Sequence, residues 1–280
     1  MWYYTELFKK HDIPVSNSVQ TNLLKLNKEY YPVIRKCFDS YVGTSFDYLS
    51  KERIYPDGRN AYDDILSQIL KLQQEGFRIH VICQLDRENI HVIPELYRFF
   101  NEKKINFALN RTFPPIHGTA CASQIAHAIT WQEYANTLCE IFDIWHADTE
   151  NVSQITPLSG IFQSYLTECP RSCTLCLPDG MNYSSIGPGG EIYPCSCFDG
   201  EEHLLGTIYT DSPADIVRKR HEMDGRCITN DELGCPECEC YGKLCLGGCF
   251  HARAIGWQRE ECNVYRVVWK HMDEVLKKMN

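Results

Sequence analysis

Cysteine is the residue type that gives this 280-residue chain its greatest capacity for chemistry, because the chain contains sixteen of them. The N-terminus MWYYTELFKK lacks the basic start and small-residue cleavage site of a signal peptide, so we expect a cytoplasmic protein. Disulfides are uncommon in that compartment. Thiolates are instead the ligands that zinc, copper(I) and iron–sulfur clusters prefer, so the cysteines predict a metal-binding protein.

The cysteines gather in the second half of the chain at spacings typical of metal ligands. CPRSCTLC (169–176) has the spacing Cys-x3-Cys-x2-Cys, and CPECECYGKLCLGGC (235–249) begins with Cys-x2-Cys and ends with Cys-x3-Cys. A zinc ribbon normally has two Cys-x2-Cys pairs about 15–20 residues apart. The enclosed Gly247 and Gly248 permit close backbone approach and let N–H groups point at an anionic cluster. The spacing favours iron–sulfur clusters and leaves a zinc-binding interaction module as an alternative.

The charge and hydropathy of the chain exclude several classes of partner. A formal net charge of −9 and a pI near 5.6 argue against nucleic acid or an anionic membrane surface, because either partner requires a basic face. No apolar run approaches the roughly 20 residues that span a bilayer. With 44% apolar residues the chain can fill a core. We therefore expect a folded protein that binds neither nucleic acid nor a membrane.

The first half of the chain repeats a strand followed by a helix. The expected strands are 15–22, 41–47, 78–85 and 105–110, and the expected helices are 26–37, 61–76 and one that ends near residue 103. The helix 61–76 places Ile65, Ile69 and Leu72 on one face. A capping box at Thr130 and Glu133 predicts a further helix to about residue 146. This order predicts a parallel sheet with crossover helices, in either an open doubly wound sheet or part of a barrel.

Polar residues follow each of the predicted strands. In both architectures chemistry collects at the carboxyl ends of the strands, where the loops converge. The polar residues at these ends are Gln20, Thr21, Asn22, Ser45, Asp47, Gln84, Asp86, Asn110 and Arg111. A single polar residue at a strand end is commonly only solvated. The whole set is therefore stronger evidence for a functional site than any single residue in it.

Short elements separate the cysteine groups of the second half. MNYSSIGPGGEIYPC (181–195) predicts a β-hairpin around a Gly-Pro-Gly-Gly turn, which holds Cys195 back over Cys176. SPADIVRKRHEM (212–223) predicts a short helix with Ser212 as its N-cap. RVVWKHMDEVLKKM (266–279) predicts an amphipathic C-terminal helix.

These cysteines resemble the seven-cysteine pattern of the SPASM domain, found at the C-terminus of radical S-adenosylmethionine (radical SAM) peptide-modifying enzymes such as sulfatase maturases and ribosomal-peptide maturases. The match is Cys176-x13-Gly190-x4-Cys195, then Cys235-x2-Cys238-x6-Cys245-x3-Cys249, then Cys262, with the EIYPC hairpin and the LLGTI segment (204–208). It covers roughly residues 165–265. Six residues separate Cys238 from Cys245 where five are usual, so Cys240 could compete as a ligand.

The resemblance implies two auxiliary [4Fe–4S] clusters and names their ligands. The first cluster takes one upstream cysteine, for which Cys169 fits best and Cys173 is the alternative, with Cys176, Cys195 and Cys249. The second cluster takes Cys235, Cys238, Cys245 and Cys262. The roles of Cys197, Cys227 and Cys240 stay open. Because neighbouring cysteines serve different clusters, we expect this domain to depend on its metal to fold.

The first half resembles the barrel domain of the same enzymes. VSNSVQTNLL looks like their middle strand and YVGTSFDY like the next one. By this likeness an S-adenosylmethionine site is bordered by Gln20, Asn22, Ser45, Asp47 and Arg111. The resemblance implies an α/β fold with an incomplete (β/α) radical SAM partial barrel at 1–150, a small cysteine-rich SPASM iron–sulfur domain at 165–265 and a C-terminal helix at 266–280.

CPRSCTLC has the same spacing as the motif whose cluster cleaves S-adenosylmethionine in these enzymes. That motif precedes the strands matched here, whereas this triad follows them and its Cys176 begins the auxiliary pattern. We therefore expect the chain to lack the N-terminal CxxxCxxC segment, which lies before Met1 or on a complementing chain. S-adenosylmethionine is then expected to bind only with that segment.

The expected function is that of the C-terminal portion of a radical SAM enzyme that modifies a peptide or protein. Its reaction is reductive cleavage of S-adenosylmethionine and hydrogen abstraction from a peptide side chain, with auxiliary clusters that accept an electron or bind substrate. Sulfatase maturases carry an aspartate directly after the hairpin cysteine, whereas this chain has Ser196, which favours another modification over formylglycine formation. The alternatives are a non-catalytic iron–sulfur scaffold or electron-transfer protein and, less favoured, a zinc-binding interaction module.

Overall fold

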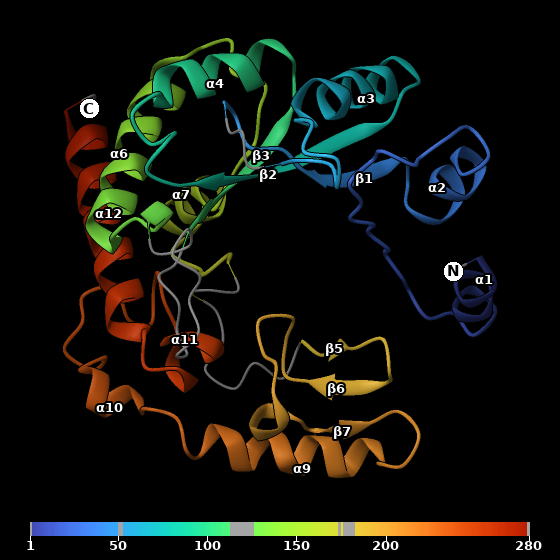
Figure 1. Cartoon of the computed structure of the whole chain (residues 1–280). Helices are drawn as coiled ribbons and strands as arrows, with labels where there is room; N and C mark the ends of the chain where they lie inside the picture. Colours follow the sequence, from blue (N-terminus) through green and yellow to red (C-terminus); the bar gives the residue numbers. More distant parts are fainter. Residues whose placement is uncertain (1, 50–52, 113–125, 173–174, 176–182, 279–280) are drawn as a thin grey trace. The chain divides into compact units, whose positions relative to one another are not determined.

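The computed structural model describes residues 2–49, 53–112, 126–172, 175 and 183–278. The chain divides into two compact units, Met1–Pro157 and Leu158–Asn280, which are described separately (Figure 1). The dividing point falls between the sequence-based ranges 1–150 and 165–265. The predicted ligands Cys173 and Cys176 lie outside the described residues.

The first unit is built on a parallel sheet whose strands follow one another in sequence order. Its described strands are β1 (Tyr41–Ser45), β2 (Arg78–Leu85), β3 (Asn106–Arg111) and β4 (Ile155–Thr156). Right-handed crossovers between neighbours in this order carry the connecting helices to one face of the sheet. Figure 1 accordingly shows α3 (Tyr62–Gln74) and α4 (Ile93–Glu102) on the same side of β2. The predicted α/β fold with a parallel sheet is confirmed.

Several elements of the first unit match the prediction from the sequence. The buried residues of α3 are the three on its predicted apolar face, Ile65, Ile69 and Leu72. Strand β2 has the predicted bounds, and the chain enters it through Gly76 at a φ of 83°. α6 (Trp131–Ala147) begins at the predicted capping box, in which the Glu133 backbone N–H donates to Thr130 Oγ1 at 3.1 Å.

The predictions of a strand at 15–22 and a helix at 26–37 are wrong in extent. In the first stretch only Gln20 forms a bridge, with Gly43 of β1, and after it Leu23 adopts a φ of 64°. α2 (Tyr31–Cys37) starts late because Pro32 is tolerated only in the first turn of a helix. α1 (Trp2–Lys10) and β4 have no counterpart among the predicted elements.

The second unit consists mostly of short elements. Its antiparallel sheet comprises β5 (Ser185–Ile186), β6 (Glu191–Tyr193) and β7 (Gly206–Thr207). Its other elements are α7 (Leu158–Thr167), η1 (Glu201–His203), α9 (Pro213–Asp224), α10 (Asn230–Leu233), β8 (Gly248–Cys249), α11 (Phe250–Ala254) and α12 (Gln258–Lys277). The hairpin and the Ser212 cap of α9 are confirmed. α12 begins well before residue 266, because Gln258, Val264 and Tyr265 extend its buried face toward its N-terminus.

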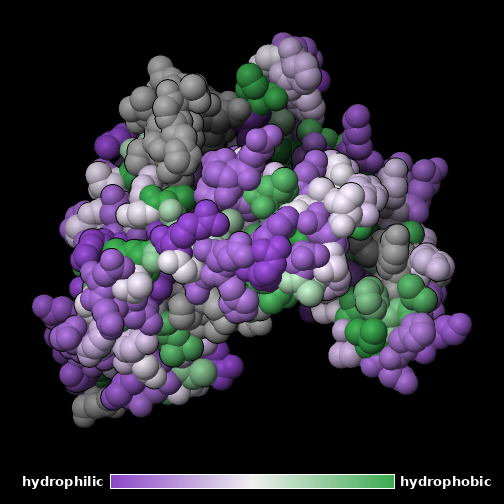
Figure 2. Space-filling model, turned by 90° about the horizontal axis from the view of Figure 1, so that it is seen from below, coloured by the Kyte–Doolittle hydropathy of each residue, from purple (hydrophilic) through white to green (hydrophobic). Residues whose placement is uncertain are grey.

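The surface of the described residues is largely polar. Figure 2 shows a face on which hydrophilic side chains predominate and hydrophobic ones form small separate groups. Exposed charges pair locally, as on α9, where Arg218 Nη1 lies 2.7 Å from Glu222 Oε1. No helix in the described part of the chain is long and apolar enough to cross a membrane.

Candidate metal centre

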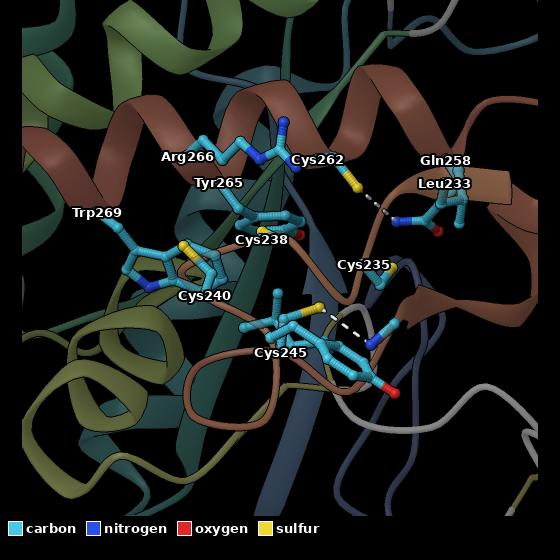
Figure 3. Close-up of a pocket in the computed structure, with 13 residues that line it drawn as sticks. Leu233, Cys235, Cys238, Cys240, Cys245, Gln258, Cys262, Tyr265, Arg266 and Trp269 are labelled. Carbon is cyan, nitrogen blue, oxygen red and sulfur yellow. Dashed lines mark hydrogen bonds between the residues drawn. The ribbon is translucent and has the colours of Figure 1, made fainter. Parts of the chain in front are cut away.

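Five cysteines of the second unit line one pocket (Figure 3). They are the four that the resemblance assigns to one cluster, Cys235, Cys238, Cys245 and Cys262, together with Cys240. The other lining residues are Leu175, Leu233, Tyr241, Gly247, Gln258, Tyr265, Arg266 and Trp269. Within the described ranges, no three His, Cys, Asp or Glu side chains surround a position for a single metal ion.

A hydrogen-bonded loop carries four of these cysteines. Gly234 ends α10 in the left-handed conformation, with a φ of 71°, and turns the chain into Cys235. The backbone N–H of Cys238 then donates to the Cys235 carbonyl at 2.9 Å. The N–H of Cys245 donates to the Cys240 carbonyl at 3.0 Å. These two turns fold the loop so that its cysteine side chains lie around the pocket.

Helix α12 supplies a second wall of the pocket. Its lining residues, Gln258, Cys262, Tyr265, Arg266 and Trp269, recur at a spacing that places them on one helical face. Figure 3 shows Cys262 on α12 beside the loop that carries the other cysteines. The predicted helix starts at residue 266 and so lacks Gln258, Cys262 and Tyr265 of this face. Helical spacing counted outward from Cys262 is the sequence signal that identifies it.

Two sulfur atoms of the pocket accept hydrogen bonds from uncharged N–H groups, drawn as dashed lines in Figure 3. The backbone N–H of Gly247 donates to Cys245 Sγ at 3.3 Å. The side-chain Nε2 of Gln258 donates to Cys262 Sγ at 3.4 Å. N–H groups directed at sulfur stabilise thiolates and the sulfur ligands of iron–sulfur clusters. These two N–H groups would stabilise thiolate or cluster-bound sulfur at Cys245 and Cys262.

Cys238 differs from its neighbours in the ease with which it ionises. Burial raises its pKa, but the N–H of Cys240 and the guanidinium of Arg266 donate to its sulfur and bring the pKa below its ordinary value. Burial prevails elsewhere and raises the pKa of Cys245 to about 11, that of Cys240 to about 12 and that of Cys235 as well. A metal that binds these sulfurs as thiolates has to displace protons.

The glycine pair of CLGGC has the conformation and the close contacts that only glycine permits. Gly247 and Gly248 adopt φ values of 112° and 93°. A Cβ on Gly248 would overlap the Gln258 carboxamide, and one on Gly247 would overlap Asn230 and the Arg253 guanidinium. The close backbone approach that the sequence predicts here is therefore present.

The described cysteines of the other predicted cluster are Cys169, Cys195 and Cys249. Cys195 packs against an apolar cluster that consists of Phe198, Leu205, Met223 and Phe250. Cys249 is the N-cap of α11, whose first residue is Phe250. Cys169 is exposed after α7. The structure thus packs Cys195 against an apolar cluster, places Cys249 directly before Phe250 of that cluster in the sequence, and leaves Cys169 exposed.

Cys195 has a thiol that ionises readily. A hydrogen bond from the Cys197 side chain is the main cause, the charge of Arg220 adds to it, and together they outweigh burial and lower the pKa of Cys195 to about 6. Arg220 is itself buried and donates from Nη1 to the Pro194 carbonyl at 3.1 Å. Cys195 is therefore disposed to act as a thiolate ligand near neutral pH.

The residues assigned to a cofactor site in the first unit are Gln20, Asn22, Ser45, Asp47 and Arg111. Gln20 bridges to Gly43, whereas Asn22 is exposed. Asp47 is buried, where its Oδ1 accepts from the Gln84 backbone N–H at 2.7 Å and its Oδ2 lies 2.7 Å from Arg53 Nη2. Burial nonetheless raises the pKa of Asp47, because desolvation outweighs these two partners.

The strand register separates two of these residues. Ser45 pairs with Ile82, so it shares a face of the sheet with Asn110. Arg111 pairs with Leu85 and belongs to the opposite face, where it is buried. Side chains alternate along a strand, so adjacent residues at a strand end cannot both face one site unless the chain turns. Ser45 and Arg111 therefore do not line one face of the sheet.

The chain is similar in sequence to two sulfatase-maturating enzymes. It is 22% identical over 265 residues to the cysteine-type anaerobic sulfatase-maturating enzyme of Clostridium perfringens, a match that covers 89% of this chain and 69% of the relative. It is 22% identical over 254 residues to the serine-type enzyme of Bacteroides thetaiotaomicron, covering 84% of this chain and 61% of that relative. No model of a protein family matches the chain.

Solved structures of a sulfatase-maturating enzyme have the same fold. Native anSMEcpe with bound AdoMet superposes with a TM-score of 0.77 at 19% identity, covering 98% of this chain and 79% of that one. The complex of anSMEcpe with AdoMet and the Cp18Cys peptide gives a TM-score of 0.76 with the same coverage. The resemblance to sulfatase-maturase-like enzymes expected from the cysteine pattern is confirmed.

Proposed function

We propose that this chain serves radical SAM chemistry on a peptide or protein substrate, and that its second unit is a SPASM domain with two auxiliary [4Fe–4S] clusters. The similarity to anaerobic sulfatase-maturating enzymes over most of the chain supports the enzyme class. A structural neighbour that contains AdoMet and a peptide supports the kinds of cofactor and substrate. A cytoplasmic location is part of the proposal.

The observation that carries the proposal is the gathering of Cys235, Cys238, Cys245 and Cys262 in one pocket, with N–H groups directed at their sulfurs. This donor set fits a [4Fe–4S] cluster, because thiolates are its protein ligands and N–H groups stabilise its negative charge. When bound, such a cluster accepts or donates one electron or binds substrate. The chain itself provides the ligands and the N–H donors, and Tyr265 and Trp269 add aromatic side chains to the lining of the pocket.

The other cluster is proposed at Cys195 and Cys249, with Cys176 and either Cys169 or Cys173. The lowered pKa of Cys195 and the apolar cluster beside it support a thiolate site. Buried Arg220 contributes positive charge near Cys195. The proposal leaves the choice between the two upstream cysteines to experiment.

The first unit is proposed as a partial (β/α) barrel that contributes to the S-adenosylmethionine site. The sequence order of its parallel strands, with α3 and α4 on one side, supports barrel-type winding over a doubly wound sheet. Gln20, Asn22, Ser45, Asp47 and Arg111 remain its proposed border. Of these, Asp47 is held by Arg53 and Gln84, so its expected role is to fix the loop after β1.

Cleavage of S-adenosylmethionine requires a further cluster with three cysteine ligands of its own. The triad at 169–176 lies in the second unit, and its last member belongs to the auxiliary set. The proposal therefore takes the cofactor-cleaving motif from an N-terminal segment or a complementing chain. Ser196 follows the hairpin cysteine, so the proposed product is a peptide modification other than formylglycine.

Anaerobic reconstitution followed by iron, sulfide and zinc analysis tests the proposal. Two clusters correspond to about eight irons for each chain, and the expected zinc content is negligible. Zinc without sulfide indicates an interaction module and contradicts the proposal. An assay for 5′-deoxyadenosine, with and without a segment that carries CxxxCxxC, then separates the enzyme from an iron–sulfur scaffold. Cleavage only when the segment is present is the expected result, and absence of cleavage in both mixtures favours the scaffold.

A further inference from the structure

Arg253 of α11 is a buried cation beside the cysteine pocket. Its side chain is 6% exposed in a unit that otherwise keeps most of its charges at the surface. Nε donates to the Gly247 carbonyl at 2.9 Å, Nη1 donates to the Ile228 carbonyl at 3.1 Å, and Nη2 donates to Asn230 Oδ1. All three acceptors are neutral, and no carboxylate in the described part of the chain forms an ion pair with Arg253.

An arginine in this position requires a negative partner. Burial of an unpaired charge is costly, and arginine cannot relieve the cost by losing its proton. Neutral carbonyls satisfy its N–H groups and leave its net charge uncompensated. The cysteine pocket adjoins this arginine, because Gly247, whose carbonyl accepts from Arg253 Nε, lines that pocket.

Arg253 also holds the peptide group that faces one of these sulfurs. Its Nε donates a hydrogen bond to the carbonyl of Gly247. The backbone N–H of Gly247 in turn donates to Cys245 Sγ at 3.3 Å. The guanidinium occupies the space that a Cβ on Gly247 would fill. Arg253 therefore sets the orientation of the CLGGC turn and brings a positive charge to it.

We infer that Arg253 is the internal counter-cation of the metal–thiolate site at Cys235, Cys238, Cys245 and Cys262, and the positioning residue for the Gly247 N–H. This inference rests on the proposed function for the identity of the metal group. A four-thiolate cluster carries net negative charge, which compensates the buried guanidinium. The compensation is mutual, so loss of the cation weakens metal binding and makes the cluster harder to reduce.

The test compares R253Q and R253K with R259Q in the full chain after anaerobic reconstitution with iron and sulfide. Arg259 is a matched control, because it is exposed on α12 and donates to one neutral carbonyl, that of Glu232, at 2.7 Å. The readouts are the release of iron to a chelator and the reduction potential from a titration followed by electron paramagnetic resonance. R253Q is expected to weaken iron retention about 10–100-fold, as loss of an outer-shell partner does, and to lower one cluster's potential.

R253K keeps the positive charge and loses the planar guanidinium. The reduction potential of the cluster in R253K is therefore expected to be nearer to the wild-type value than the potential in R253Q. R259Q is expected to match the wild type in both readouts. Unchanged retention and potential in R253Q overturn the inference, as does failure of both Arg253 variants to load when R259Q loads, because that result assigns Arg253 to general packing. If the wild type and R259Q also bind no iron, the proposed function itself fails.

Discussion

The two units of this chain bury charge in different ways. In the first unit, buried Asp47 has the Arg53 guanidinium at 2.7 Å as its counter-charge and the Gln84 N–H as a second partner. In the second unit, buried Arg253 has only neutral acceptors, and five cysteines line one pocket. Asp47 therefore has its counter-charge within its own unit. For Arg253 we propose that an anionic metal–thiolate group supplies it.

The same contrast appears in the secondary structure. Strands β1 to β3 of the first unit have five to eight residues and pack under helices, whereas those of the antiparallel sheet in the second unit have two or three. A sheet of such short strands contributes little stability by itself. The first unit is therefore stabilised by an apolar core, whereas we expect the second to be stabilised by metal binding.

Withholding iron is expected to have the largest effect on the difference in stability between the two units. In iron-free protein we expect the second unit to lose its protease resistance and much of its ordered circular dichroism, because its folding free energy comes from metal binding. We expect a protected fragment close to residues 1–157 to persist. Limited proteolysis with mass spectrometry, with and without reconstituted iron, measures both. Equal resistance of the two units in iron-free protein would show that they do not differ in this way.

Removal of one ligand sharpens the contrast within the second unit. C245S is expected to lose about half of the bound iron, since one of two clusters then lacks a ligand. C139S is the control, because Cys139 lies on α6 in the first unit and outside both predicted ligand sets. Iron and sulfide analysis of the two variants measures the difference. Full iron content in C245S would remove this cysteine from the site.

A cavity in the core of the first unit is expected to act on that unit alone. Ile69 of α3 is fully buried, so I69A is expected to lower the free energy of unfolding by about 2–5 kcal/mol. Iron content is expected to be unchanged, because the pocket belongs to the second unit. Chemical denaturation and iron analysis measure the two quantities. A parallel loss of iron would mean that the units do not fold independently.

The smallest expected effect concerns the cap of α6. T130A removes the side chain that accepts from the Glu133 N–H, and such a change costs about 1 kcal/mol of stability. S212A makes the equivalent change at α9 in the second unit. With iron bound, we expect no measurable loss of stability in S212A, because metal binding is expected to dominate the stability of the second unit. The loss in T130A is expected to be the same with and without iron. Denaturation curves with and without iron compare the two variants.

Local patterns were sufficient for the elements whose signals lie within the element. The apolar spacing in α3, the capping boxes of α6 and α9 and the hairpin at 185–193 are examples. The strand at 15–22 was wrong in extent because strand pairing depends on a distant partner, and only Gln20 of this stretch bridges to β1. The predicted start of α12 was too late because Gln258, Val264 and Tyr265 are buried by contacts with distant residues, which extend the helix toward its N-terminus.

The sequence likewise predicted one part of the candidate site and not another. Cysteine spacing was enough to select the four cysteines that line one pocket, because ligands are close in sequence where a tight loop carries them. The same spacing carried no information about Arg253, whose partners include Gly247 and Ile228. Arginine is common on helices, and burial together with a hydrogen bond to the Gly247 carbonyl distinguishes this one.

The sequence by itself determined the alternation of strands and helices in the first unit, the cysteine sets and the family resemblance, because each is written in local spacing. The tertiary structure decided which face of the sheet each strand-end residue occupies, which side of α12 meets the cysteine loop and which arginine is buried beside it. These features depend on register, packing and burial, which are set by contacts between residues distant in sequence. The buried charge of Arg253, on which the proposed role beside a metal site rests, therefore emerged only from those contacts.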